Sequence, residues 1–94
     1  MAVYVDTMKA QYGRMVMCHM MADTREELLA MATLIGVRHK WVQRSGTVYE
    51  HFDVCQAKKA LAIQHGAIEV SRKEFLSLIL KKRGRVTAKK PSPK

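Results

Sequence analysis

The feature that most constrains the fold is a helix-start signal that occurs three times in the chain. Each time, an aspartate or serine suited to cap a helix is followed three residues later by Glu or Gln, which together satisfy free N–H groups of the first helical turn. The signals lie at residues 23–26, 53–56 and 71–74. Apolar residues then recur at helical spacing, and Gly36 and Gly66 follow the first two stripes. The sequence therefore predicts three helices.

Short apolar or β-branched runs of the kind that form strands alternate with these helices. They lie at residues 3–5, 15–21, 37–43 and 68–70, whereas residues 9–14 are typical of a loop. Helices that alternate with short strands favour an α/β fold with a mostly parallel sheet and helices on its faces. We therefore expect about four strands and three helices in the order β-β-α-β-α-β-α.

Length and charge distribution predict one domain followed by a basic tail. The chain has 94 residues and a formal net charge of +9. Residues 81–94 hold seven of the 17 Lys and Arg residues and none of the 8 acidic ones, so they supply +7 of that charge. We expect a single α/β domain over residues 1–80 and a disordered tail over residues 81–94 that attracts nucleic acid without sequence preference. The cations assigned to this attraction are Lys81, Lys82, Arg83, Arg85, Lys89 and Lys90.

The N-terminus and the cysteines indicate the compartment. Residues 1–6 have no basic segment, and Asp6 comes before any apolar run long enough for a signal peptide. Every apolar stretch is shorter than the roughly 20 residues of a membrane span. Cys18 and Cys55 are too few for a disulfide framework and are expected to be free thiols. These features predict a cytoplasmic protein without a membrane partner.

Polar residues follow the predicted strands, where ligands of open α/β sheets usually bind. Asp6 follows the first strand, and His51 and Asp53 share a side because residues two apart in an extended segment point the same way. His19 joins them if its face of the second strand is the same. Each also has a simpler interpretation, since Asp23 and Asp53 fit helix caps and His19 fits a hydrogen-bonded core histidine.

A zinc site and a cysteine nucleophile are the less favoured chemistries. Cys18 and His19 are adjacent in a strand and point to opposite faces, so a site shared with His51 and Cys55 has three ligands at most. Cys55 would lie in the first turn of a helix, which favours a thiolate, but Asp53 opposes that effect. We therefore assign no metal ligand and expect inert thiols. Glycine-rich phosphate loops of the Rossmann or P-loop type do not occur in the sequence.

Several spaced motifs agree in order between Met1 and about Leu80. They are Met1-Ala2-Val3-Tyr4-Val5-Asp6, Cys18-His19-Met20 with Ala22-Asp23, Glu27-Leu28, Trp41 with Gln43, His51-Phe52-Asp53-Val54, Lys58-Lys59-Ala60 and Gly66-Ala67. Together they resemble a small family of bacterial and phage proteins catalogued as domain of unknown function 4031. The resemblance implies no activity. The recurring polar and aromatic positions that it implies are Tyr4, Asp6, His19, Asp23, Trp41, Gln43, His51 and Asp53.

The chain departs from that family pattern in one respect that bears on function. Many relatives carry a second acid after the first strand, where this chain has Thr7, and a Lys-Arg pair where it has Lys58-Lys59. If that acid is a metal ligand in the relatives, its absence argues against a metal-dependent reaction here.

Two classes of function fit the sequence, and we rank a nucleotide- or nucleic-acid-binding module without a cofactor first. In it Trp41 would stack on a base and Lys59 would meet a phosphate. The ligand-binding residues assigned to it are Tyr4, Asp6, His19, Trp41, Gln43, His51, Asp53 and Lys59.

The alternative is a metal-assisted phosphoesterase or nuclease in which Asp6 and Asp53 hold Mg²⁺ or Mn²⁺. Its catalytic candidates are His19, His51 and Asp53, with either histidine as general base. A third interpretation is an accessory protein that binds a host protein through an exposed strand edge.

Overall fold

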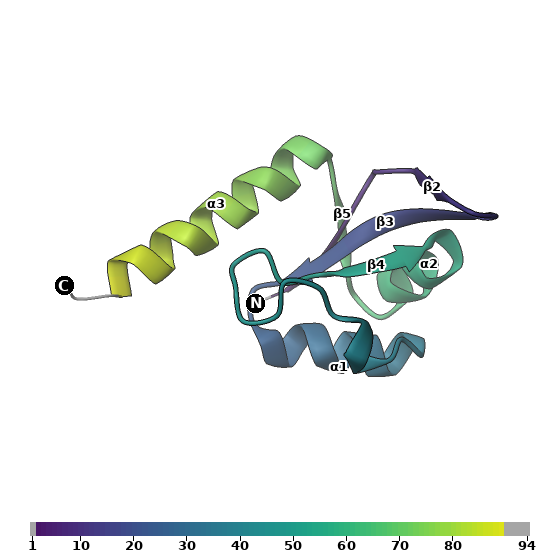
Figure 1. Ribbon diagram of the computed structural model, residues 1–94, viewed down its shortest axis with the longest axis horizontal. Coiled ribbons are helices and arrows are strands. Elements are labelled where there is room, and N and C mark those ends of the chain that lie inside the picture. The colour runs from purple at the N-terminus through teal and green to yellow at the C-terminus, as the bar shows by residue number, and fades with distance from the viewer. Residues whose placement is uncertain (1, 90–94) are drawn as a thin grey trace.

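The structure is a computed structural model that describes residues 2–89, with side chains for residues 2–82. Its elements follow one another along the chain as shown in Figure 1. They are β1 (Val3–Asp6), β2 (Ala10–Tyr12), β3 (Met15–Ala22), α1 (Arg25–Ile35), the 3-10 turn η1 (His39–Trp41), β4 (Phe52–Cys55), α2 (Gln56–Gln64), β5 (Ile68–Val70) and α3 (Arg72–Lys89).

The described strands form one mixed sheet of five strands built around β3. The first residues of β3 pair with β2 and its last residues pair with β1, while β4 pairs along the opposite edge, and all three pairings are antiparallel. β5 pairs with β1 in parallel. The α/β class is confirmed, but the expected mostly parallel sheet of about four strands is wrong. A tight hairpin joins β2 to β3 and makes these two strands antiparallel. A helical crossover would instead have made the strands that it joins parallel.

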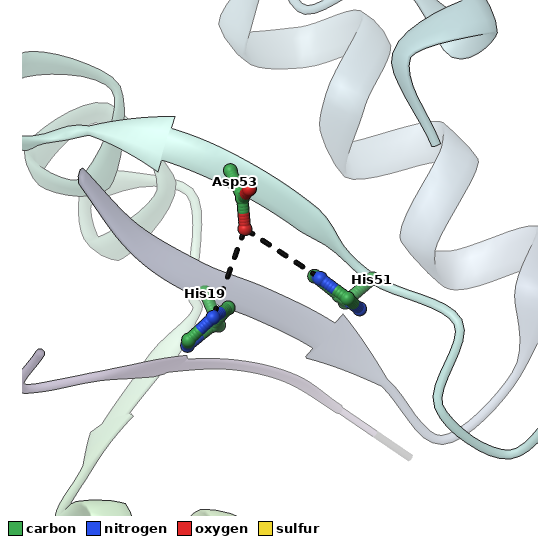
Figure 2. Close-up of side chains that lie close together, drawn as sticks. All are labelled: His19, His51 and Asp53. Carbon is green, nitrogen blue, oxygen red and sulfur yellow. Dashed lines mark ion pairs between the residues drawn. The ribbon is translucent and has the colours of Figure 1, made fainter. Parts of the chain in front are cut away.

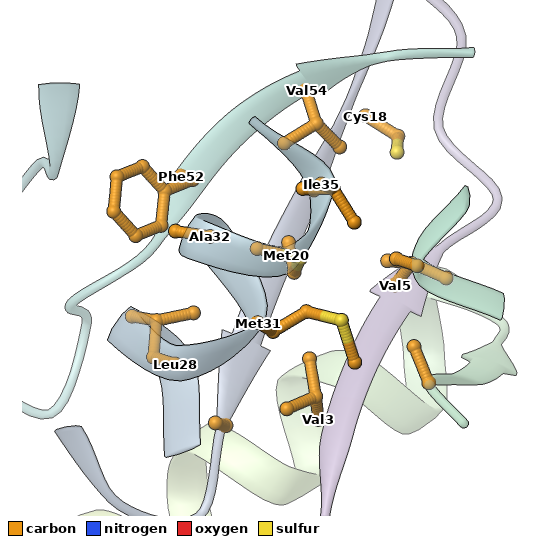
Figure 3. Packing of buried hydrophobic residues seen from close by; sticks show 13 residues of the cluster. Val3, Val5, Cys18, Met20, Leu28, Met31, Ala32, Ile35, Phe52 and Val54 are labelled. Carbon is orange, nitrogen blue, oxygen red and sulfur yellow. The ribbon is translucent and has the colours of Figure 1, made fainter. Parts of the chain in front are cut away.

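The two faces of the sheet are covered differently. Residues of β1, β3 and β4 that point to one face pack against α1 and α2 and form the hydrophobic core shown in Figure 3. Val5, Met20 and Phe52 are fully buried there. α3 lies on the opposite side of the sheet (Figure 1), where the Phe75 side chain is buried. One face is therefore a conventional core, and the other combines buried Met21 and Phe75 with polar side chains.

The predicted helix starts at residues 23–26 and 71–74 have capping interactions, and the one at residues 53–56 is wrong. At α3, Ser71 N–H donates to Glu74 and the Glu74 N–H donates to the Ser71 hydroxyl, as predicted. α1 is capped by Thr24, one residue later than expected, and ends at Gly36 with a φ of 78°. Asp53 caps no helix, because it lies inside β4 and α2 begins only at Gln56.

Two loop and strand predictions also fail. The segment 9–14 contains β2, and the turn at Gly13, with a φ of 61°, connects β2 to β3. The segment 37–43 is not a strand: it contains η1, and only Gln43 forms a single bridge, with His51. This segment lacks a continuous apolar face, and it carries the exposed cations Arg38 and Lys40 instead.

The structure also differs from the expected tail. α3 continues through Leu80 to Lys89, so the predicted domain boundary falls inside a helix, and Lys81, Lys82, Arg83, Arg85 and Lys89 are helical positions. Lys90 lies outside the described residues. Among the helices of the described chain, none is both long and apolar enough to cross a membrane.

Candidate metal centre

Strand pairing brings three chemistry-bearing side chains into one row across the sheet. His19 of β3 stands opposite Asp53 of β4, and the β1–β3 register, continued by one residue from Val5 and Met20, places Asp6 opposite His19. Directly opposed residues of neighbouring strands point to the same face. The row therefore lies on the face away from the α1–α2 core.

His19, His51 and Asp53 converge at this row, as Figure 2 shows. Asp53 Oδ1 lies 3.7 Å from His19 Nε2 and 3.5 Å from His51 Nε2. One ligand atom from each of the three side chains lies within 4.8 Å of the others. Ligand atoms around a tetrahedral ion with bonds of about 2.1 Å are about 3.4 Å apart, so small side-chain rotations would close these three onto an ion.

The second nitrogen of each histidine is already held by an acceptor. His19 Nδ1 lies 2.8 Å from Asp6 Oδ2, and His51 Nδ1 lies 2.6 Å from the Tyr49 carbonyl oxygen. Carboxylate and carbonyl oxygens only accept, so in both rings Nδ1 carries the hydrogen, and the neutral imidazole keeps its lone pair on Nε2. Both Nε2 lone pairs are then available to a cation, as in metal sites whose histidines are oriented by a carboxylate or carbonyl.

The carboxylates are oriented as well. The Gln43 side-chain amide donates to Asp53 Oδ2 at 2.7 Å, which leaves Oδ1 facing the histidines. Asp6 is buried, and its Oδ1 also accepts the backbone N–H groups of His19 and Met8. Asp6 therefore contacts His19 and not the open side of the cluster, whereas the alternative function derived from the sequence had Asp6 hold Mg²⁺ or Mn²⁺.

An ion pair between the exposed Arg25 and the buried Glu50 holds the loop that carries His51. Arg25 Nε and Nη2 donate to Glu50 Oε2 at 3.0 and 2.6 Å, and the Gly46 N–H donates to the same oxygen. Burial alone would raise the pKa of Glu50, but the hydrogen bonds from Arg25 and Gly46 and the charge of Arg25 hold this pKa below its ordinary value. Glu50 is therefore an anion that fixes the loop between Gln43 and His51.

A cavity of about 200 Å³ opens on the His51 side of the cluster. Asp6, His19 and His51 line it together with Arg44 and Arg72. β5 ends beside Asp6, so the start of α3 brings Arg72 to this cavity. Arg44 adopts a φ of 56°, and its guanidinium lies 6.0 Å from the centre of the Tyr49 ring. The cavity thus joins the cluster to two cationic side chains that the sequence did not single out.

The structure brings Asp6, His19, Gln43, His51 and Asp53 together, but it separates other residues assigned to the same ligand. Lys59 is buried beside Glu69, with 2.5 Å between Nζ and Oε2, on the core face of the sheet. The Tyr4 hydroxyl lies 3.3 Å from Asp23 Oδ2. Trp41 is exposed and lines a second, larger cavity.

The cysteines take no part in the histidine cluster. Cys18 points into the core, as strand alternation predicted, and burial together with the charge of Asp6 raises its thiol pKa to about 11. Cys55 is half-buried at the start of α2, and both thiols are free.

The tyrosine carbonyl and the two arginines carried little sequence signal. A backbone acceptor such as that of Tyr49 is invisible in a residue pattern. Arg44 lies in a loop and Arg72 in a helix start, and neither position is periodic with the other site residues. The alternation of polar and apolar residues from His51 to Val54 is the signal that would have predicted β4.

Comparison with known protein families shows which family the chain belongs to. Residues 3–82 match the sequence model of a family described as "Protein of unknown function (DUF4031)". The chain belongs to this family. The resemblance seen in the motifs is thereby confirmed, and the DUF4031 match spans the whole cluster from Asp6 to Asp53. No curated protein and no solved structure matches the chain. Because a DUF4031 domain has no assigned activity, function has to be argued from the site.

Proposed function

We propose that the chain binds a divalent transition-metal ion through His19, His51 and Asp53 and uses it to hydrolyse phosphoesters. The observation that carries this proposal is the convergence of two imidazole nitrogens and one carboxylate oxygen within 4.8 Å, each already oriented by a hydrogen-bond partner. This geometry moves the metal-assisted reaction ahead of the binding module that the sequence favoured.

The ligand set indicates the kind of ion. Imidazole nitrogens suit Zn²⁺, Fe²⁺, Co²⁺ and Ni²⁺, and Mn²⁺ tolerates them, whereas Mg²⁺ prefers oxygen ligands and retains several waters. Two nitrogens and one oxygen therefore favour a transition metal over Mg²⁺. Asp6 contributes by accepting the His19 Nδ1 hydrogen, an interaction that makes the coordinating nitrogen more basic.

Three protein ligands are what hydrolytic metal centres use. They leave at least one coordination position for water or substrate. An ion held there would acidify a bound water and would polarise a phosphoryl oxygen. Hydrolysis would join the oxygen of this water to phosphorus and break the P–O bond to the ester oxygen, and a proton of the water would leave with the alcohol.

Two arginines support a phosphoester as the substrate. Arg44 and Arg72 line the cavity into which His19 and His51 face. Guanidinium groups bind phosphate oxygens with paired, charge-assisted hydrogen bonds and stabilise negative charge in a phosphoryl transition state. The two arginines therefore favour hydrolysis of an anionic ester.

The proposal is tested by hydrolysis of bis(p-nitrophenyl) phosphate after the protein is stripped with a chelator and reloaded with Zn²⁺, Mn²⁺, Co²⁺ or Mg²⁺. A transition metal should restore turnover, and Mg²⁺ should restore much less. His51→Ala and Asp53→Asn should each lower the rate at least a hundredfold, because each removes a ligand.

His65→Ala is the matched control, because His65 is an exposed histidine at the end of α2 and lies outside the cluster. It should keep the rate of the unmodified protein. Equal rates for His51→Ala and His65→Ala would refute the proposal. Retention of nucleotide binding without any metal requirement would then return the binding module to first place.

A further inference from the structure

A second cavity, of about 830 Å³, adjoins the same cluster on the side away from Arg72. His19 lines both cavities, while Gln43 and Asp53 line the second one. The candidate metal centre therefore lies between two openings. A substrate bound at the ion can extend in both directions from its reacting phosphorus.

Much of the lining of this second cavity is apolar or aromatic. The site face of β3 continues beyond His19 through Met17 and Met15, which line the cavity. Among the residues of the three helices, only Lys58 of α2 lines it. Tyr12 and Trp41, from β2 and η1, also line it, and they are 75% and 62% exposed. Large aromatic side chains are normally more buried than this in a small domain. Two exposed rings beside one cavity offer flat surfaces on which planar groups can stack.

Charge around the two cavities is mostly positive. Arg38 and Lys58 line the larger cavity, and Arg44 and Arg72 line the smaller one. The acidic lining residues are Asp6 and Asp53 among the described side chains, and both are committed to the histidine cluster. Aromatic surfaces combined with cations on both sides of a reactive centre are the features that bind single-stranded nucleic acid.

We propose that the substrate is a single-stranded nucleic acid whose phosphodiester lies at the candidate metal centre. One neighbouring base stacks on Trp41 and Tyr12 in the larger cavity, and phosphates on either side meet the arginines. This inference rests on the proposed function and specifies its substrate class. A duplex does not fit, because its bases are paired and their faces are already stacked.

Binding is measured in the presence of a chelator, so that no hydrolysis takes place and the result is independent of catalysis. The probe is an oligonucleotide of about ten residues, as RNA and as DNA, in the range that one such surface covers. Trp41 is the single tryptophan of the chain, so its fluorescence reports stacking directly. We expect quenching by at least one of the single strands and none by the matching duplex.

The stacking claim is tested with variants and with a strand that lacks bases. Trp41→Ala should weaken single-strand binding about tenfold or more, as should Tyr12→Ala, when an end-labelled strand is followed by anisotropy. An abasic strand should bind the unmodified protein equally weakly, and Trp41→Ala should weaken it no further. Leu34→Ala is the control, because Leu34 is an exposed apolar residue of α1 that lines neither cavity.

Equal affinity of Trp41→Ala and Leu34→Ala for single strands would overturn the inference, and so would abasic or duplex strands that bind as tightly as the intact single strand. These binding measurements need no metal. The nucleic-acid inference can therefore be refuted while the protein still hydrolyses bis(p-nitrophenyl) phosphate. Conversely, base-dependent binding without any metal-dependent hydrolysis would support a base-binding groove and refute the proposed function alone.

Discussion

At the scale of single residues, Asp6 connects the fold to the site. Its buried carboxylate accepts two backbone N–H groups where β1 ends, and it also holds Nδ1 of His19. A carboxylate that accepts several hydrogen bonds is stable when buried, whereas a carboxylate with no partner would not be. The same group therefore closes the β1–β3 ladder and sets the tautomer of a proposed metal ligand.

Asp6→Asn is predicted to lower metal affinity by roughly ten- to a hundredfold, because an amide orients and polarises the His19 ring less well than a carboxylate. Affinity is measured by competition with a chromogenic chelator. The melting temperature should also fall, since the amide N–H₂ cannot accept. Gln43→Ala provides a comparison at an exposed position, because Gln43 orients Asp53 from the surface. This variant should weaken metal binding while leaving the melting temperature nearly unchanged. Unaltered metal affinity in both variants would contradict the orienting role.

The two thiols are predicted to react at different rates. Cys18 is buried, and with its pKa raised to about 11, roughly one molecule in a thousand carries the thiolate at pH 8. Both cysteines line the larger cavity, but Cys55 is half-buried whereas Cys18 is only 1% exposed. A maleimide should therefore label Cys55 first and Cys18 only after denaturation, as read by peptide mass spectrometry. Native labelling of Cys18 as fast as Cys55 would show that the core opens.

At the scale of elements, β3 determines the site, because it pairs with β1 on one edge and β4 on the other at the same level. The sequence predicted β3 and the alternation that separates Cys18 from His19. It also predicted that His51 and Asp53 share a side. Local pattern was sufficient for these features, since they depend only on the two-residue period of a strand.

Local pattern was not sufficient for β4. Residues 53–56 match a helix-capping signal, yet Phe52 and Val54 are almost completely buried in the core and draw this segment into the sheet. Tertiary burial overrides a weak local signal in such a case. The sequence raised a meeting of His19 with His51 and Asp53 only on the condition that they share a face, because the β3–β4 pairing that brings Asp53 opposite His19 is not a local feature.

Attachment of α3 to the sheet is predicted to depend on Phe75. Its ring is buried, and its centre lies 5.9 Å from that of His19. Phe75→Leu should cost about 1 kcal/mol of unfolding free energy and lower the melting temperature by roughly 4 to 8 °C. Leu80→Ala, at an exposed position of the same helix, should change the unfolding free energy by less than about 0.5 kcal/mol. Equal effects of the two variants would mean that α3 does not pack as described.

At the scale of the whole molecule, the sheet separates stability from chemistry. The α1–α2 face holds the hydrophobic cluster, and the opposite face holds the histidines and the smaller cavity with Arg44 and Arg72. The larger cavity is lined from both faces, by Cys18 and Val54 as well as by His19 and Asp53. α3 extends beyond the sheet (Figure 1) and adds a basic sequence to the same molecule. The core can therefore stay intact while the opposite face and the C-terminal segment are altered.

Removal of residues 83–94 is predicted to reduce nucleic-acid attraction without disturbing the fold. This segment contains Arg83, Arg85, Lys89, Lys90 and Lys94. If three of these cations engage phosphates of a single strand, the slope of log affinity against log salt should become shallower by about 2. Metal affinity should stay the same. A salt dependence that truncation leaves unchanged would show that these cations do not contact the strand.

The central claim concerns an ion at His19, His51 and Asp53, and crystals grown with Zn²⁺ or Mn²⁺ test it most directly through anomalous diffraction. The account predicts one strong peak bonded to both Nε2 atoms and to Asp53 Oδ1 at about 2.0 to 2.2 Å, with Asp6 still on His19 Nδ1. Ordered side chains without a peak between them at saturating metal, or a peak only elsewhere, would contradict it.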